Sequence, residues 1–125
     1  MRNESEIATR AHSFLSPEGS YLVPKWDRTV KLSCEKILTD YRDGRITEAI
    51  VLVPARVDTR WWRLLWGASK RRCLITGRLK FGDSKGGSTF PSALVYLGNN
   101  EEQFSEYFQD IGMIIQDWNL EAVSV

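Results

Sequence analysis

The residues best suited to chemistry in this sequence are basic side chains gathered in the middle of the chain. Between Arg56 and Lys85 there are nine basic and two acidic residues, which gives this segment a charge of +7. The rest of the chain has eight basic and fourteen acidic residues, a charge of −6. Such a division favours one basic face that contacts a polyanion. The alternative is that the basic side chains pair with acidic helices on a solvated surface.

Six of these basic residues are the predicted nucleic-acid contacts. Arg78 and Lys80 are two positions apart, so in a strand both side chains project from one face. The other four members of the set are Lys70, Arg71, Arg72 and Lys85. Together they would line a track for phosphates, whose contacts make binding strongly dependent on salt. A structural interpretation stays open for Arg78, whose guanidinium can brace the following loop by donating to its carbonyl groups.

Two aromatic residues of the same region, Trp61 and Phe90, are candidates for stacking on a base or anchoring a partner. Trp61 and Trp62 are neighbours in a predicted helix and point to different sides, so at most one is expected fully in the core. Core packing is the alternative for Trp61. For Phe90, which precedes a proline, the alternative is that the ring closes the loop.

The sequence lacks the residues that several enzyme classes require for catalysis or cofactor binding. His12 is the single histidine, which argues against a histidine-based triad and leaves too few soft ligands for zinc. Cys34 and Cys73 have no CxxC spacing and are predicted to be reduced core thiols. No glycine-rich loop follows a strand and opens a helix, as dinucleotide-type sites require. The sequence therefore predicts no catalytic, cofactor-binding or metal-binding residue in the isolated chain.

Alternating helices and strands must position these side chains. Apolar residues at spacings of three and four predict an amphipathic helix over 25–43. The run 49–55 has no polar face and predicts a strand covered on both sides, which is typical of a mainly parallel sheet. Further elements are expected as helices near 5–15, 58–66 and 101–110, strands over 72–76 and 92–97, extended pieces at 21–24 and 79–81, and an edge strand at 113–115. The predicted class is α/β, a partial Rossmann-like, mostly parallel sheet with an antiparallel hairpin, flanked by helices.

The length of 125 residues fits one domain over 1–125, with 1–20 as an N-terminal extension that packs loosely. No apolar run reaches the ~20 residues of a membrane span, and the N-terminus has no apolar signal segment. We therefore expect no membrane partner and a cytoplasmic location.

Four blocks in order carry a resemblance to a known family. They are Val51-Leu-Val-Pro-Ala-Arg56, Asp58-Thr-Arg-Trp61, Gly77-Arg-Leu-Lys-Phe-Gly82 and Phe90-Pro-Ser-Ala-Leu-Val-Tyr-Leu-Gly98. This succession resembles the C-terminal half of phage-type DNA N6-adenine methyltransferases, and the resemblance covers roughly residues 25–116. It implies a doubly wound sheet related to the methyl-donor-binding fold, adenine in DNA as substrate and S-adenosylmethionine as donor, in a bacterial or phage-infected cell.

The chain departs from that family at its chemistry. Family members carry an Asn-Pro-Pro-Tyr type motif before the helix equivalent to 25–43, and its aromatic ring stacks on the flipped base. The nearest stretch that the sequence suggests is Ser16-Pro-Glu-Gly19, which has no amide and no ring. The donor-binding half, on the order of 60 to 100 residues by the usual size of a few βα units, does not precede it. S-adenosylmethionine is therefore not expected to bind the isolated chain.

Three functions are compatible with these residues. The first is a degenerate or split methyltransferase module that binds DNA without methylating it alone. The second is a non-enzymatic phage protein that reuses the scaffold to bind or inhibit a host protein, including one of host defence, or that forms a homodimer through surface left open by the missing half. The third is one subunit of a two-chain methyltransferase, active only with its partner chain.

Overall fold

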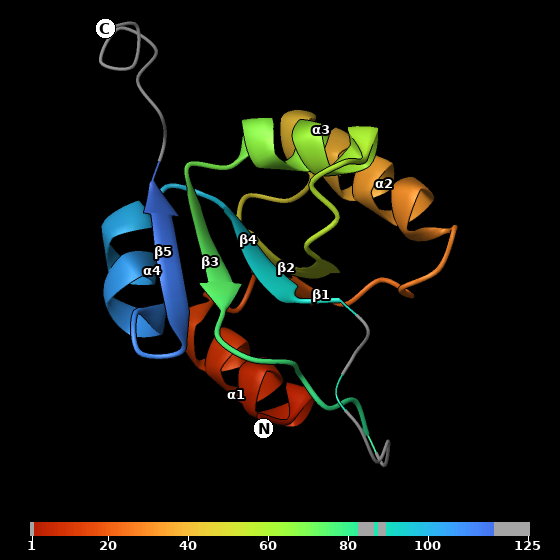
Figure 1. The fold of residues 1–125 in the computed structure, drawn as a ribbon. Helices are drawn as coiled ribbons and strands as arrows, with labels where there is room; N and C mark the ends of the chain where they lie inside the picture. The colour runs from red at the N-terminus through yellow and green to blue at the C-terminus, as the bar shows by residue number, and fades with distance from the viewer. Residues whose placement is uncertain (1, 83–86, 88–89, 117–125) are drawn as a thin grey trace, which may run out of the picture.

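The computed structural model describes residues 2–82, 87 and 90–116, which form a five-stranded sheet between two layers of helices (Figure 1). The helices of this part are α1 (Glu4–Phe14), α2 (Val30–Arg42), α3 (Arg60–Ala68) and α4 (Glu101–Phe108). The strands are β1 (Ser20–Leu22), β2 (Ala49–Pro54), β3 (Arg71–Ile75), β4 (Ser92–Leu97) and β5 (Gly112–Gln116). The α/β class predicted from the sequence is confirmed.

The sheet is mixed, and the prediction of a mostly parallel sheet is wrong. The strand order is β1-β2-β4-β3-β5, and only β1 and β2 run parallel. Strand β4 lies antiparallel between β2 and β3, and β5 is antiparallel to β3. The prediction depended on the apolar run of β2, and both β2 and β4 are indeed buried along their whole length. Such a run indicates that helices cover both faces of a strand, but it does not determine the direction of the neighbouring strands.

Alternate residues of the central strands supply two separate cores. Ile50 and Leu52 of β2 point to the face covered by α1 and α4, together with Tyr96 of β4. Val51 of β2 and Val95 of β4 point to the face covered by α2 and α3. The register sets Ile50 opposite Tyr96 and Val51 opposite Val95, so each apolar face continues from strand to strand. The two helical layers lie on opposite sides of the sheet in Figure 1.

The N-terminal segment differs from the expectation of loose packing. Within the described residues 2–20, helix α1 buries Ile7 and Ala11 in the core. Arg10 of this helix donates two hydrogen bonds of 2.6 Å each to the carboxylate of Asp110, which follows α4. The hydrogen bonds from Arg10 hold the pKa of Asp110 at about 2. Helix α1 is therefore an integral part of the layer that it forms with α4.

Helix α2 begins at Val30, later than the predicted residue 25. One oxygen of the Asp27 carboxylate accepts hydrogen bonds from the backbone N–H of Thr29 at 2.7 Å and from its hydroxyl at 2.5 Å. A short polar side chain that bonds the backbone two residues on stabilises a turn in place of a helix. Residues 25–29 therefore form a connection between β1 and α2 rather than the first turns of a helix.

Helix α3 begins as predicted, but its packing differs. The Thr59 hydroxyl accepts a hydrogen bond from the N–H of Trp62 at 3.3 Å and so caps the helix. Both Trp61 and Trp62 are buried, with 8% and 6% of their surface exposed, so the expectation that at most one lies in the core is wrong. Helix α3 contacts α2 as well as the sheet, so more than one of its sides is covered.

A buried carboxylate joins four segments on the α1 and α4 face. Glu48 accepts hydrogen bonds from the Tyr96 hydroxyl at 2.5 Å, from Asn100 Nδ2 at 3.1 Å and from the Ser16 N–H at 3.2 Å. Burial raises the pKa of Glu48, but these hydrogen bonds outweigh it and the net shift is downward. The chain passes close by at Gly98, where an added Cβ would lie 2.5 Å from the Tyr96 hydroxyl. This carboxylate therefore has a structural role.

Candidate functional site

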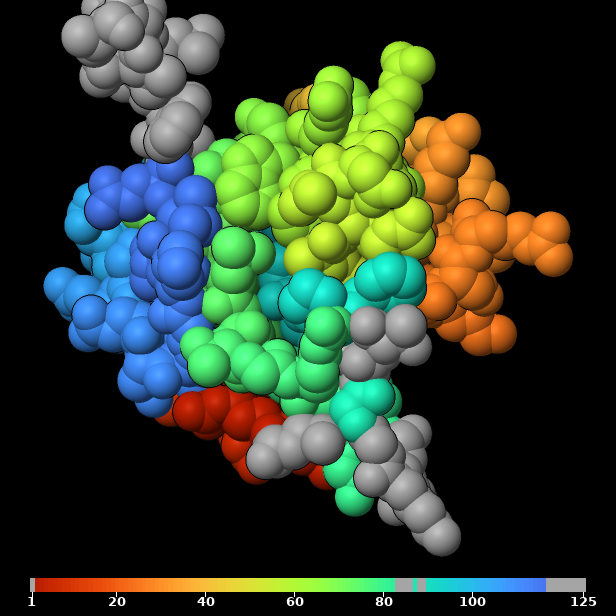
Figure 2. All heavy atoms as spheres, viewed as in Figure 1, coloured from red at the N-terminus to blue at the C-terminus, as the bar shows by residue number. Residues whose placement is uncertain are grey.

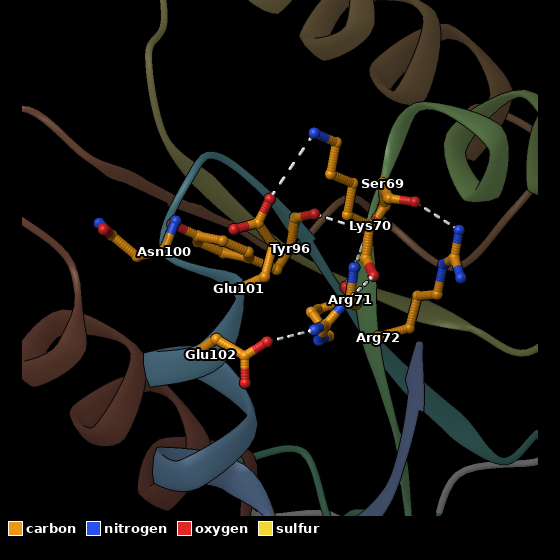
Figure 3. A network of polar contacts seen from close by, with 8 residues as sticks. All are labelled: Ser69, Lys70, Arg71, Arg72, Tyr96, Asn100, Glu101 and Glu102. Carbon is orange, nitrogen blue, oxygen red and sulfur yellow. Dashed lines mark hydrogen bonds and ion pairs between the residues drawn. The ribbon is translucent and has the colours of Figure 1, made fainter. Parts of the chain in front are cut away.

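Two of the predicted phosphate contacts, Lys70 and Arg71, face helix α4 and its acidic first turn (Figure 3). Arg71 donates to Glu102 Oε1 at 2.9 Å and to the Ser105 hydroxyl at 3.1 Å, and 12% of its side chain is exposed. Lys70 Nζ lies 3.7 Å from Glu101 Oε1. Both charges are therefore paired with an acidic helix, which is the alternative interpretation of the basic segment.

A third member of the predicted set, Arg72, lies inside the protein with 3% of its surface exposed. Its guanidinium donates to the carbonyl oxygens of Trp66 at 2.6 Å and of Gln116 at 3.2 Å, and also to that of Ser69. The same group lies over the Trp66 ring, 4.4 Å from its centroid. Arg72 thus joins the end of α3 to β5, and the prediction that it contacts phosphate is replaced by a structural role, because the group cannot reach a ligand on the surface.

The remaining predicted contacts lie after β3. Arg78 is exposed, and Lys80 is partly buried. The expectation that 79–81 continues or pairs with the preceding strand is wrong, because the backbone of Lys80 instead donates to the carbonyl of Arg2 at 2.8 Å. Lys85 lies outside the described residues. The predicted phosphate track is therefore divided between two different parts of the molecule.

A different group of residues surrounds a cavity of about 480 Å³, which we call the Phe90 cavity. Five parts of the chain form its walls: the segment after β1, the start of α2, the end of β2 with the segment after it, the start of α3 and the segment before β4. The lining residues are Trp26, Asp27, Arg28, Val30, Lys31, Pro54, Arg56, Trp61 and Phe90. The parallel strands β1 and β2 both finish at this end of the sheet. In α/β sheets, ligands bind beyond the carboxyl ends of parallel strands.

The chain forms this cavity through short local contacts. The N–H of Ala55 donates to the carbonyl of Pro91 at 2.8 Å, which keeps the segment after β2 beside the segment before β4. The Arg56 guanidinium lies 4.9 Å from the centroid of the Phe90 ring. In Figure 2, atoms of α3, of the segment entering α2 and of the start of β4 meet on one side of the molecule. Trp61 and Phe90, predicted separately as stacking residues, therefore line the same cavity.

Trp26 is the central aromatic residue of this region. It also lines a second hollow of about 360 Å³, whose lining is Val23, Pro24, Lys25, Trp26 and Phe81. The rings of Trp26 and Phe81 meet edge to face, with centroids 4.8 Å apart. Its Nε1 is buried and has no hydrogen-bond partner among the described residues. Trp26 thus connects the Phe90 cavity to the segment after β3.

The rim of the Phe90 cavity is positively charged. Arg28 and Lys31 are exposed, and within the described part of the chain no acidic group lies within ion-pair distance of either. Hydrogen bonds from Thr29 lower the pKa of Asp27, and those from Arg56 lower the pKa of Asp58. Both carboxylates are therefore ionised at neutral pH. Asp58 pairs with Arg56, whereas Asp27 keeps its negative charge on the cavity wall, where the nearby Arg28 also lowers its pKa.

The site offers groups for binding but few for catalysis. Burial raises the pKa of each of the thiols Cys34 and Cys73 to about 12, so neither is a nucleophile at neutral pH. Over residues 2–82, 87 and 90–116, no three acidic, cysteine or histidine side chains are grouped as metal ligands. None of the described helices combines the length and the apolar composition that a bilayer crossing requires.

Sequence reasoning missed Trp26, Arg28 and Lys31 as site residues. It assigned the first two to the opening turns of a helix, where they had no visible partner in the basic segment. The available signal was Pro24 followed by Asp27 and Thr29, a composition typical of a turn. A turn directly after a strand places its side chains at the edge of the sheet, where the cavity lies.

Comparisons of the chain with protein-family models, with curated proteins and with solved structures found no match. The resemblance to DNA adenine methyltransferases therefore stays a prediction that rests on the four sequence blocks.

Proposed function

We propose that this chain is a DNA-binding module of the degenerate methyltransferase type, which holds an unpaired base in the Phe90 cavity and does not transfer methyl groups alone. The observation that carries the proposal is one cavity lined by the partly buried rings of Trp26 and Phe90 and by the exposed cations Arg28 and Lys31, with the buried Trp61 in its wall. Aromatic side chains stack on bases, and cations at the rim bind the adjoining phosphates. The volume of about 480 Å³ lies in the range of ordinary ligand sites.

The position of the four sequence blocks supports this proposal. The first block ends at Arg56, the second at Trp61, and the fourth begins with Phe90, and all three residues line the Phe90 cavity. The third block contributes Phe81, which packs against Trp26. Three of the four blocks thus line one cavity, and the third packs against one of its wall residues.

A better counterpart of the family motif follows β1. Val23-Pro24-Lys25-Trp26 has its proline at the second position and its aromatic ring at the fourth, as in Asn-Pro-Pro-Tyr, whereas Ser16-Pro-Glu-Gly19 lies in the connection between α1 and β1. The first position is Val23, whose side chain cannot accept a hydrogen bond from the amine of adenine. The motif therefore retains a ring for stacking and lacks the group that would hold the reacting amine.

Binding to DNA with an unpaired base tests the proposal. Fluorescence anisotropy of a labelled duplex with one extrahelical adenine should show affinity about tenfold above that for the fully paired duplex, the order of one stacked base. Phe90→Ala should remove this preference. Tyr107→Ala removes an aromatic ring that lies on α4, and it should leave the preference intact. Equal binding of both duplexes by the unmodified protein would contradict the proposal.

Methyl transfer is tested separately. Calorimetry of the isolated chain with S-adenosylmethionine should show no heat of binding, because no glycine-rich cofactor loop opens a helix after a strand. If the chain is one subunit of a two-chain methyltransferase, methylated adenine should appear only when a second polypeptide with a donor-binding half is added. Methylation by the isolated chain would contradict the proposal that it is inactive alone, and it would not contradict the proposal that it binds DNA.

Protein binding is the second candidate function, and one observation favours it. The edge strand β1 borders a groove of about 440 Å³ with Leu22, Ile37 and Ile46 on its walls and Leu32 exposed at 64%. Edge strands pair readily with another strand, so β1 and the exposed Leu32 beside it suit a second copy related by a two-fold axis, whereas Lys36 and Asp40 on the rim are paired with each other at 3.0 Å. Light scattering should then show a dimer that Leu32→Glu dissociates. A monomer at all concentrations would exclude this homodimer.

A further inference from the structure

We propose that the ligand is single-stranded at this site and occupies two adjoining subsites, with a second nucleotide bound in a hollow between α2 and α3. The inference rests on the proposed function, because the first subsite is the Phe90 cavity that takes the unpaired base. It adds the class of ligand, a single strand with at least two consecutive unpaired nucleotides, and the residues that hold the second of them.

The second subsite is a hollow of about 270 Å³, which we call the Leu64 hollow. It is lined by Lys31, Glu35, Arg60, Trp61 and Leu64. Trp61 and Lys31 also line the Phe90 cavity, so the two spaces adjoin and share one aromatic and one cationic wall. A ligand longer than one nucleotide that leaves the Phe90 cavity past Lys31 enters the Leu64 hollow.

The side chains of the Leu64 hollow suit a nucleotide. Leu64, exposed at 39%, gives an apolar surface next to Trp61 on which a base can pack. Arg60 and Lys31 are exposed, and among the described residues neither has an acidic group within ion-pair distance. Glu35 accepts hydrogen bonds from a base amino group and disfavours a phosphate near it. The phosphate between the two bases is therefore expected beside Lys31 and Arg60.

The pair of subsites selects against duplex DNA. A paired duplex keeps neighbouring bases stacked on each other, whereas two separate hollows that share only Trp61 and Lys31 as walls require consecutive bases to leave the stack. Unstacking each base costs free energy, and this cost is least for a strand that is already single. Proteins that bind single strands combine the same elements, aromatic platforms beside a positively charged path for the backbone.

Competition by short oligonucleotides tests the second subsite. A fluorescein-labelled single-stranded 12-mer of deoxyadenosine is bound to the full chain, and unlabelled mono-, di- and tetranucleotides displace it, with anisotropy as the readout. The dinucleotide should compete about tenfold better than the mononucleotide, the order that one added stacked base contributes. The step from two to four nucleotides should add less per nucleotide.

Two variants that add one negative charge at an exposed apolar position assign the effect to the Leu64 hollow. Leu64→Glu should remove most of the advantage of the dinucleotide and leave competition by the mononucleotide unchanged. Met113→Glu is the control, because Met113 is exposed at 62% on β5 and lines neither of the two subsites. Circular dichroism checks that both variants unfold at the temperature of the unmodified protein.

The outcomes separate this inference from the proposed function. The second subsite is overturned if the 12-mer binds tightly but the mono- and dinucleotide compete equally. It is also overturned if the advantage of the dinucleotide survives Leu64→Glu. Neither result contradicts base binding in the Phe90 cavity. A paired 12-base-pair duplex that displaces the label as well as the single strand overturns the preference for single strands. No binding of the 12-mer at low salt overturns the proposed function and this inference together.

Discussion

The two basic regions of this protein differ in what their charges face. Lys70, Arg71 and Arg72 are consecutive in the sequence, and each is bound to carboxylates or carbonyl groups of the protein itself (Figure 3). Arg28 and Lys31 are separated from the basic segment by more than twenty residues, yet they meet Arg56 and Phe90 at one cavity. The consecutive run 70–72 therefore has a structural role, whereas Arg28 and Lys31 are exposed beside the cavity.

The difference shows that acidic partners decide which cations stay available. The first turn of α4 presents Glu101 and Glu102 directly to the Lys70–Arg71 pair. Around the Phe90 cavity, Asp58 pairs with Arg56, whereas no ion pair among the described residues involves Arg28 or Lys31. A basic side chain is available to an anionic ligand only where no acidic side chain of the protein already pairs with it.

The strongest test of the difference between the two regions is Arg72→Met. The variant keeps an apolar stem but leaves several carbonyl groups without their donor, so the free energy of unfolding should fall by about 3 kcal/mol. Urea denaturation followed by circular dichroism measures this change. A variant of unchanged stability that had lost DNA binding would reverse the assignment of Arg72 to a structural role.

Charge reversal at the other region should affect binding and not stability. In Arg28→Glu/Lys31→Glu, two cations no longer neutralise phosphates, so DNA affinity should fall about 30-fold, or about 2 kcal/mol. The slope of log K against log salt should also decrease by about 0.7 for each phosphate of a single strand that the variant leaves without its cation. The control is Lys70→Glu in the other region, and an equal loss of affinity per reversed charge there would break the distinction between the regions.

A smaller effect is expected at Glu48, the buried carboxylate of the α1 and α4 face. Glu48→Gln should lower the free energy of unfolding by about 1.5 kcal/mol, because its hydrogen bonds lose their charge. The pKa of Glu48 is lowered in the folded state, so its contribution is complete above the ordinary value of about 4.3 and is lost as the pH falls through the folded pKa. Urea denaturation measures the difference in free energy of unfolding between the unmodified protein and the variant, and this difference should be smaller below about pH 4 than at about pH 7. A gap that widened in acid would contradict the downward shift.

The smallest effect belongs to Lys70→Ala. Its ion pair with Glu101 spans 3.7 Å and the lysine is 62% exposed, so the free energy of unfolding should change by less than about 0.5 kcal/mol. DNA affinity should change less than about twofold, since the charge is already neutralised locally. Anisotropy with the same labelled strand measures this, and a tenfold loss would restore Lys70 to the binding surface.

Much of the fold was predictable from sequence pattern. The apolar runs located β2 and β4, and a helix was expected near 58–66, where α3 lies. Strand direction was not predictable, because burial on both faces is the same for parallel and antiparallel neighbours. The start of α2 was missed because the periodicity of apolar residues continued through Trp26, while the hydrogen bonds of Asp27 favoured a turn.

The candidate site was predictable only in part. Trp61 and Phe90 were selected by residue type and both line the Phe90 cavity, whereas Trp26, Arg28 and Lys31 were not selected. Phe90 stands more than sixty positions after Trp26, and nothing in local pattern connects the two. Only the pairing of β2 with both β1 and β4 brings these segments to one edge of the sheet.

The sequence by itself determined that this chain alternates helices and buried strands, that its thiols lie in the core, and that its basic residues are concentrated. Local hydrogen bonding and apolar periodicity are sufficient for these properties, since they depend on residues a few positions apart. The tertiary structure alone decided which cations face carboxylates and which face a cavity. That outcome depends on the order and direction of the strands, which bring together groups separated by tens of residues and so set each charge beside its partner or leave it open to a ligand.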